Sequence, residues 1–462
     1  MQDARLFPGM EAGSSNSQAG GSSPPASHAE AGRRPPAERS PDPSGPPRLR
    51  RPDRRQVLLE PVCLEERLPA DHPARTIWAV VCRLDLSAFE AAILARGEQP
   101  GRAATDPRLL VALWLLAHTD NVGSARALDR LCQEHDAYRW LCGGVSLNYH
   151  TLSDFRVGHG AALDQLFTNV LTSLLDSGAV QVARLTQDGT RVRASAGAGS
   201  FRRRARLEEL QALAAERVAE LKKQVADAPA EAARQQAAQQ RAAREREQRI
   251  TAALAAMTEL EQIKAHTPAS KPGKANPPRA STTDPEARRM RLPDGGFGPA
   301  YNVQLAQDPD SRAIVAVDVV PHGTDHGEDA PVRAQVAQRT GQRVREQIFD
   351  GGYVKLTNIE QAAQAGVTVY APIPARGRPL RTCLRRADDS PAVAAWRARM
   401  CSAAGRAVYK LRGQTCETVN ADLKTFRGLG AFTVRGLARC RCVVLWAALA
   451  YNLLHFHQVL LT

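Results

Sequence analysis

The spacing of apolar positions divides the chain into a helical amino-terminal part and a later part in which strands alternate with helices. Residues 1–53 have no apolar periodicity and are rich in Pro, Ser, Gly, Ala and Arg, a composition typical of disordered basic tails. From residue 54 to 178 apolar side chains recur at helical spacing, most clearly in residues 109–118, just after the helix-start signal Pro107. The pattern predicts a disordered tail and then an all-helical domain.

Residue 179 opens a region with the two-residue period of β-strands. One strand comes first, then two strands, then helix, strand, helix and strand, then terminal helices. This order predicts an α/β fold with a mixed sheet over residues 179–460. The expected strands are residues 180–194, 301–306, 313–320, a short run ending at Asp350, and 367–373. The expected helices are residues 329–341, 357–365, 403–426 and 434–458.

Two insertions interrupt this predicted sheet. In residues 201–282, two apolar stripes flank a break near Pro229, which predicts an antiparallel helical hairpin followed by a linker rich in Pro, Lys and Ser. Residues 375–402 are rich in arginine and contain proline, and we expect a second insertion there. The order of elements fits an RNase H-like domain whose first strand is separated from the second by the hairpin.

The charge of the chain favours a phosphate-rich partner. The net charge is +14 and comes mainly from arginine, although charge alone does not separate DNA, RNA and acidic membranes. Arg126 and Arg130, on short helices, favour a helical domain of DNA-binding type, and a bundle that merely packs on the rest of the chain is the alternative. A basic cluster at the start of the hairpin is a second candidate DNA contact. It consists of Arg202, Arg203 and Arg204.

Other locations and kinds of site have less support. The first residues lack the apolar core of a signal peptide, and the apolar run 443–454 is short for a membrane span and contains Asn452. We expect a cytoplasmic, nucleoid-associated protein without a membrane partner. The nine cysteines include no Cys-x2-Cys pair, which argues against a zinc ribbon and for reduced thiols. His322 and His326 have a spacing that suits zinc on a helix, but the neighbouring Pro and Gly favour a polar loop.

Three carboxylates, Asp188, Asp350 and Glu417, are the candidate catalytic residues and metal ligands. Each aspartate precedes glycine, which alone favours a turn. A strand feeds Asp350, however, and ligand residues collect at the carboxyl ends of strands in α/β sheets. Mg²⁺ prefers hard oxygen ligands, and paired ions support in-line phosphoryl transfer on nucleic acid. If the three acids converge, we expect at least one raised pKa through mutual repulsion.

Glu417 lies on a polar stripe of its helix. Lys410, Gly413, Asn420 and Lys424 fall on the same stripe at spacings of three, four and seven residues. A solvated surface face is the usual explanation of a helical glutamate. A metal ligand flanked by phosphate-binding groups accounts better for one acid between two lysines, so Lys410, Asn420 and Lys424 are candidate DNA contacts.

Taken together, these stretches resemble a bacterial insertion-sequence transposase of the DDE type, close to the insertion-sequence family called eleven-eighty-two. Three regions between about residues 55 and 455 carry the resemblance. They are residues 109–144 with Thr151-Leu-Ser-Asp-Phe-Arg, residues 187–203 around Gln187-Asp-Gly-Thr-Arg, and residues 284–438 from Asp284-Pro-Glu-Ala-Arg-Arg through Asp350-Gly-Gly-Tyr to Phe432-Thr-Val-Arg-Gly-Leu-Ala.

The resemblance implies an RNase H-like catalytic domain with Asp188, Asp350 and Glu417 as the metal-binding triad. It implies two Mg²⁺ (or Mn²⁺) ions and an enzyme, active as a homodimer, that binds the terminal inverted repeats of its element, cleaves there and transfers strands to target DNA. A non-catalytic DNA-binding descendant, or an RNase H-like nuclease that does not join strands, are the alternatives. The presence of an acid at all three positions argues against the non-catalytic descendant.

Neighbouring families carry a Tyr-x2-Arg-x3-Glu-x6-Lys signature. Tyr409, Arg412 and Lys424 fit it, but four residues separate Arg412 from Glu417. On an ideal α-helix the extra residue turns Arg412 about 140° away from Glu417. We therefore expect Lys424 to border the cleft and Arg412 to point elsewhere.

Overall fold

The computed structural model describes the larger part of the chain. The predicted tail lies outside the described residues, and so do the middle of the hairpin, most of the linker and the start of the Arg-rich insertion. The described residues are 61, 63–96, 103–226, 233–266, 277–374 and 386–462.

Short helices make up the amino-terminal part, as the apolar spacing predicted. The central helix begins where Pro107 stands at its first position and the Asp106 side chain accepts a hydrogen bond from the backbone N–H of Arg108 at 2.8 Å. All but two of its residues are buried. The helices are α1 (Leu64–Arg67), α2 (Pro73–Val81), α3 (Ser87–Glu90), α4 (Pro107–Thr119), α5 (Ala125–Glu134), α6 (Asp136–Cys142), α7 (Tyr149–Gly158) and α8 (Gly160–Asp176).

A mixed, six-stranded sheet follows, so the prediction of an α/β fold with a mixed sheet is confirmed. Its order is β4-β5-β1-β7-β8, with β6 also paired to β5. The central strand β1 runs antiparallel to β5 and parallel to β7. The strands are β1 (Arg184–Arg193), β4 (Arg288–Arg291), β5 (Phe297–Gln307), β6 (Ile314–Val320), β7 (Glu346–Ile348) and β8 (Thr368–Tyr370).

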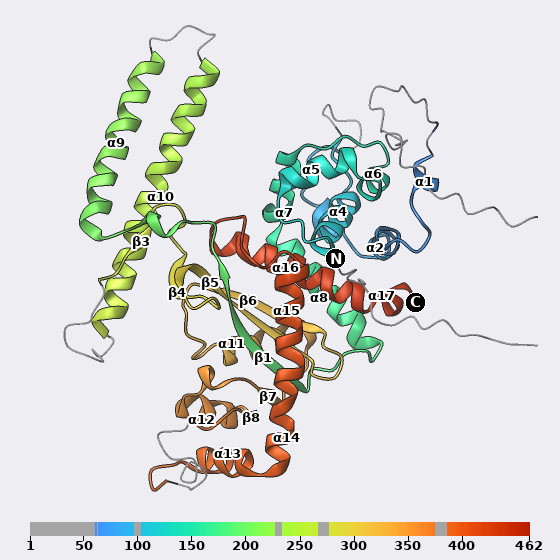
Figure 1. Cartoon of the computed structure of the whole chain (residues 1–462), viewed down its shortest axis with the longest axis vertical. Helices are drawn as coiled ribbons and strands as arrows, with labels where there is room; N and C mark the ends of the chain where they lie inside the picture. Colours follow the sequence, from blue (N-terminus) through green and yellow to red (C-terminus); the bar gives the residue numbers. More distant parts are fainter. Residues whose placement is uncertain (1–60, 62, 97–102, 227–232, 267–276, 375–385) are drawn as a thin grey trace, which may run out of the picture. The chain divides into compact units, whose positions relative to one another are not determined.

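The first insertion holds the two longest helices among the described residues, α9 (Arg204–Ala226) and α10 (Ala233–His266), which lie side by side (Figure 1). A two-stranded ladder of β2 (Phe201–Arg202) and β3 (Ala280–Ser281) closes the base of this hairpin. Leu207, Ala253 and Met257 form its buried core with Ala280. The hairpin therefore has a small core of its own, separate from the core under the sheet.

The later helices cover both faces of the sheet. On one side lies α11 (Asp329–Thr340), and on the other a long helix that is interrupted by a single π-helical turn. The second insertion contains an additional helix, α13, which starts at the N-cap Ser390 and Pro391 and was not predicted. The remaining elements are α12 (Leu356–Gln364), α13 (Pro391–Cys401), α14 (Ala403–Arg412), the π-turn η5 (Gly413–Glu417), α15 (Thr418–Phe426), α16 (Leu437–His455) and α17 (His457–Leu461).

One hydrophobic core joins the helical part to the sheet. Helix α16 packs against α4, α7 and α8 as well as β6 (Figure 1), and the Trp446 indole N–H donates to the Arg156 carbonyl at 3.0 Å. Residues 61–462 accordingly form one compact unit. The predicted boundary at residues 178–179 lies within this shared core and stays a prediction.

Helix α16 and the cysteines bear on two expectations, that no helix is long enough for a membrane span and that the thiols are reduced. The predicted apolar run of 12 residues is too short to cross a membrane. The whole of α16 is long and apolar enough to do so, yet most of this helix is buried inside the fold. A core helix passes the same test, so α16 is weak evidence for a membrane. Cys401 is disulfide-bonded, so the expectation of reduced thiols is wrong at that residue.

Candidate functional site

The three predicted acids come from three separate elements, which meet beside the neighbouring strands β1 and β7. Asp188 lies on β1, and its side chain is 15% exposed. Asp350 follows β7 directly, and its carboxylate accepts a hydrogen bond from the Gly352 backbone N–H at 2.7 Å. Glu417 ends the π-turn and is 72% exposed. Contacts of α14 and the π-turn with β1 bring the helical acid to the strands.

The guanidinium group of Arg412 lies among these carboxylates. Its Nη2 is 3.0 Å from Oδ1 of Asp188 and 3.9 Å from Oδ2 of Asp350, and its Nη1 is 4.0 Å from Oε1 of Glu417. One cation thus contacts all three acids, which places them around a common centre. The prediction that Arg412 points elsewhere is wrong.

The π-turn explains why that prediction failed. The prediction assumed an ideal α-helix, in which residues four apart share a face. In a π-turn the hydrogen bond spans five residues, so Arg412 and Glu417, which are five apart, return to the same side. The extra residue is absorbed locally between α14 and α15. Such single π-turns inside α-helices are rare and occur often at functional sites.

Electrostatics at Asp188 reflect its burial. Burial is the main reason that the pKa of Asp188 is raised; Arg412 opposes the shift, and the charges of Asp350 and Asp325 add to it. The predicted raised pKa is therefore present, but repulsion between acids is not its main cause. The charge of Asp188 also raises the pKa of Arg412 against the opposing effect of burial.

Two further side chains of the predicted stripe border the same place. The Asn420 Nδ2 donates to Oδ2 of Asp188 at 3.1 Å. Lys424 is half-buried, and burial lowers its pKa while the Asp188 charge opposes the change. Both residues therefore lie beside Asp188, whereas Lys410 is exposed on α14.

The predicted DNA contacts outside the stripe lie on other surfaces. Arg126 is exposed on α5 and stacks over the Tyr149 ring at 5.0 Å, and Arg130 is exposed on the same helix. At the hairpin, Arg203 is exposed, but Arg204 is engaged with Glu261 through a contact of 2.7 Å. Arg202 donates to the carbonyls of Gly199 and Phe201. The DNA-binding role of these arginines stays a prediction.

The oxygen donors at this centre suit a hard cation such as Mg²⁺. The position of the Arg412 guanidinium indicates that a positive charge there interacts with all three acids. In the arrangement observed, however, no three His, Cys, Asp or Glu side chains of the described residues are close enough together to hold a metal ion. The residue types thus fit the metal, and in their present arrangement they are paired with Arg412.

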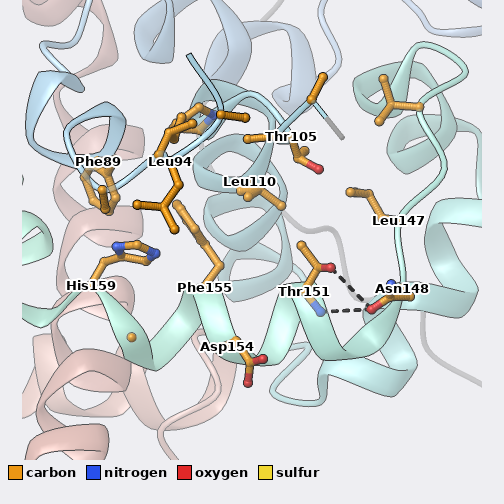
Figure 2. Close-up of a pocket in the computed structure, with 18 of the residues that line it drawn as sticks. Phe89, Leu94, Thr105, Leu110, Leu147, Asn148, Thr151, Asp154, Phe155 and His159 are labelled. Atoms are coloured by element: carbon orange, nitrogen blue, oxygen red, sulfur yellow. Dashed lines mark hydrogen bonds between the residues drawn. The ribbon is translucent and has the colours of Figure 1, made fainter. Parts of the chain in front are cut away.

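A separate pocket lies in the helical part, away from the acids. Figure 2 shows Phe89, Leu94, Leu110 and Phe155 around it, with His159 at one side. Its lining is largely apolar, and its few polar groups are partly engaged with one another. Among its lining residues Asp154 is a single carboxylate and His159 a single imidazole, whereas the candidate site brings three carboxylates together, so this pocket is not the candidate site.

Sequence reasoning missed two residues at the acid site. Arg412 was assigned to the wrong side of its helix. Asp325, in the loop between β6 and α11, is 6% exposed and lies next to Gly189 and Gly352. The loop was correctly predicted to be polar, but only its histidines were considered. The signal that could have pointed to Asp325 is an acid between two glycines in a loop that follows a strand.

Comparison with known protein families identifies the class of protein. A transposase domain (DUF772) matches residues 62–157, and a transposase DDE domain matches residues 379–457. The first match covers α2–α6 and most of α7, and the second includes Arg412, Glu417 and α16. No curated protein and no solved structure matches the chain.

Both matches indicate a transposase. More particularly, they support an insertion-sequence transposase of the DDE type. The narrower assignment to the family called eleven-eighty-two stays a prediction.

Proposed function

We propose that this transposase binds the ends of its insertion sequence and cleaves and transfers DNA strands at the site of Asp188, Asp350 and Glu417. The observation that carries the proposal is the meeting of these acids around one cation, since their segments are separated by more than 60 residues in each case. Strand order β4-β5-β1-β7-β8, with helices on both faces, supports an RNase H-like catalytic domain over residues 179–460. Residues 54–178 would then be the DNA-binding domain.

The three acids would hold Mg²⁺ or Mn²⁺, expected as two ions. When bound, such ions activate the attacking water or hydroxyl and stabilise the leaving oxygen of an in-line displacement. The protein's own contribution is to hold Asp188 on β1 and Asp350 just after the adjacent parallel strand β7, and to bring Glu417 to them on a helix. Asn420 fixes the orientation of Asp188 through its amide N–H, which reduces the number of carboxylate rotamers.

The basic groups beside the acids would position the DNA backbone. Lys424 is half-buried next to Asp188. The Arg412 guanidinium group, 3.0 Å from Asp188, would supply a second positive charge beside the acids. Lys410 and Asn420 lie along the same stripe, and the net charge of +14 adds a long-range attraction.

Contacts farther from the chemistry would distinguish the element ends. Arg126 and Arg130 on α5 are exposed and therefore accessible to terminal repeats. Arg202, Arg203 and Arg204 are proposed to contact flanking DNA, in which case Arg204 exchanges Glu261 for phosphate. Two ends must be held together during transposition, so we propose a homodimer on DNA, in the cytoplasm and associated with the nucleoid.

A strand-cleavage assay tests this proposal. The full chain is incubated with Mg²⁺ and labelled DNA that carries the terminal repeats, and cleavage, strand transfer and binding are measured separately. We expect Asp188→Asn, Asp350→Asn and Glu417→Gln each to lose cleavage and strand transfer while end binding changes little, because many phosphate contacts elsewhere support binding.

Asp176→Asn and Glu216→Gln are the matched controls. Both acids are exposed on helices of other regions, α8 and α9, and both variants should cut like the wild type. If wild-type protein binds the ends without cutting, the enzyme assignment is wrong and a binding protein remains. If it cuts without joining, it is a nuclease. Equal loss of binding and cleavage in the three acid variants would indicate a structural role.

A further inference from the structure

The loop between β6 and α11 contributes a fourth acid, Asp325, to the neighbourhood of the candidate site, and this acid is buried. The Asp325 carboxylate is held by donors from the two central strands. Its Oδ1 accepts hydrogen bonds from Asn302 Nδ2 at 2.7 Å and Gln304 Nε2 at 2.8 Å, and its Oδ2 lies 3.3 Å from Arg191 Nη2. A buried charge with three donors has a defined position.

This carboxylate lies against the backbone beside both catalytic aspartates. A Cβ atom at Gly189 would be only 2.1 Å from Oδ1 of Asp325, and a Cβ at Gly352 would be 3.3 Å from its Oδ2. Gly189 directly follows Asp188, and Gly352 comes two residues after Asp350. Because side chains alternate along a strand, Asp325 touches the face of β1 opposite to the Asp188 side chain. Asp325 therefore packs against β1 on the face that does not carry the Asp188 carboxylate.

A buried polar layer connects Asp325 to β7, the strand that precedes Asp350. Gln304 accepts hydrogen bonds from Gln187 Nε2 at 3.1 Å and from the Tyr353 hydroxyl. Gln187 in turn accepts one from Gln347 Nε2 at 2.6 Å. The amides of this layer are fully buried. Such connected networks fix one arrangement of the backbone, since breaking any link leaves a buried group unpaired.

We propose that Asp325 is a positioning residue, which fixes the separation of Asp188 and Asp350 by bracing the glycines next to them. It does not touch DNA in this proposal and acts through the two aspartates. The inference rests on the proposed function, because the separation matters only if both aspartates hold the same metal ions. Groups that orient metal ligands from outside commonly change metal affinity about 10- to 100-fold when they are replaced.

The test compares Asp325→Asn with Asp389→Asn in the full chain. Asp389 is a matched control because it is also buried and pairs with an arginine, Arg397, at 2.8 Å. It is not among the atoms nearest to a Cβ at Gly189 or Gly352. We expect Asp325→Asn to weaken the binding of Mn²⁺, measured calorimetrically, at least about tenfold. Asp389→Asn should bind Mn²⁺ like the wild type even if its unfolding temperature falls.

Amide hydrogen exchange provides a readout without metal. Exchange at residues 188–190 and 350–353 should become faster in Asp325→Asn and stay unchanged in Asp389→Asn. Unchanged exchange and Mn²⁺ affinity in Asp325→Asn, or equal changes in both variants, would overturn the inference. If wild-type protein neither binds Mn²⁺ nor cuts DNA, the proposed function fails, while the exchange comparison still decides whether Asp325 holds the two backbones.

A steric variant tests the same contact from the other side. Gly189→Ala should displace the Asp325 carboxylate and weaken Mn²⁺ binding to a similar extent. In an Asp325→Ala background the added methyl group loses its closest clash and keeps only that with Gln304 Nε2, at 2.6 Å. Gly189→Ala should then have a smaller further effect than it has in the wild type. Additive effects of the two substitutions would mean that Asp325 and Gly189 act independently, which would contradict the proposal.

Discussion

At the scale of single residues, the site is defined by how its charges compensate one another. Asp188 is the most buried of the three acids, and Arg412 contacts all of them. Because a buried acid lies next to a single arginine, two properties can be measured without DNA: the pH dependence of the protein's stability, and the loss of unfolding free energy when the arginine is replaced.

The raised pKa of Asp188 leads to a pH prediction. In the unfolded chain an aspartate titrates near about 3.9, and in the folded chain burial raises the pKa of Asp188. The folded state thus binds this proton more tightly, and the stability gained from protonation is lost as the pH rises through the folded pKa. Asp188→Asn does not titrate. The unfolding temperature of Asp188→Asn minus that of the wild type should therefore increase as the pH rises from about 3.5 to about 7. Thermal unfolding without divalent ions measures this difference, and a constant or falling difference would contradict the prediction.

Removal of the arginine should destabilise the metal-free protein. In Arg412→Gln, three carboxylates lose their common cation, and breaking a largely buried pair costs about 3 kcal/mol. Arg412→Lys keeps the charge but loses the planar fork, so it should recover part of the loss. Urea unfolding without divalent ions provides the measurement. Arg412→Gln with wild-type stability would show that the guanidinium contributes nothing to holding the acids.

At the scale of elements, the π-turn Gly413–Glu417 sets which side chains reach the site. Deletion of the exposed Gln414 leaves three residues between Arg412 and Glu417, the spacing that an ordinary α-helix needs to place both on one face. The turn should then relax to α-helix without moving Asn420. We expect circular dichroism, unfolding temperature and strand cleavage to stay close to the wild type.

A deletion in a regular helix is the control for this experiment. Removing the exposed Ala407 from α14 should rotate the helix before it by about 100° and lower the unfolding temperature strongly. If deletion of Gln414 is as damaging as deletion of Ala407, the π-turn does more than absorb one residue.

The same elements show how far the sequence predicts the structure. The strands β5 and β6 and the helix α11 were predicted within a few residues, because each has a clear apolar period. The edge strand β4 was missed, since Arg288, Arg289 and Arg291 surround its single buried Met290. The place of Arg412 depends on a π-turn, and that of Asp325 on tertiary packing, and neither has a periodic signal. Asp188, Asp350 and Glu417 were proposed together because their local patterns and the family resemblance agreed, and the structure brings them around Arg412; their catalytic role stays a prediction.

At the scale of the whole molecule, α16 joins the helical part to the sheet. Trp446 is fully buried between them, and its replacement by alanine should cost about 3–5 kcal/mol. Because the core is shared, we expect Trp446→Ala to lower the stability of both parts in one transition. Amide exchange in α4 and in β6, followed through the same denaturant series, measures this. Destabilisation of α4 alone would mean that the two parts have independent cores.

The central claim is that Asp188, Asp350 and Glu417 form one metal site. Crystals of the full chain soaked in Mn²⁺, with diffraction recorded at the manganese edge, test it most directly. The account predicts two anomalous peaks about 3.5–4 Å apart among these carboxylates, with the Arg412 guanidinium moved away from Asp188. Strong peaks elsewhere, or none among the three acids while Arg412 stays at 3.0 Å from Asp188, would contradict it.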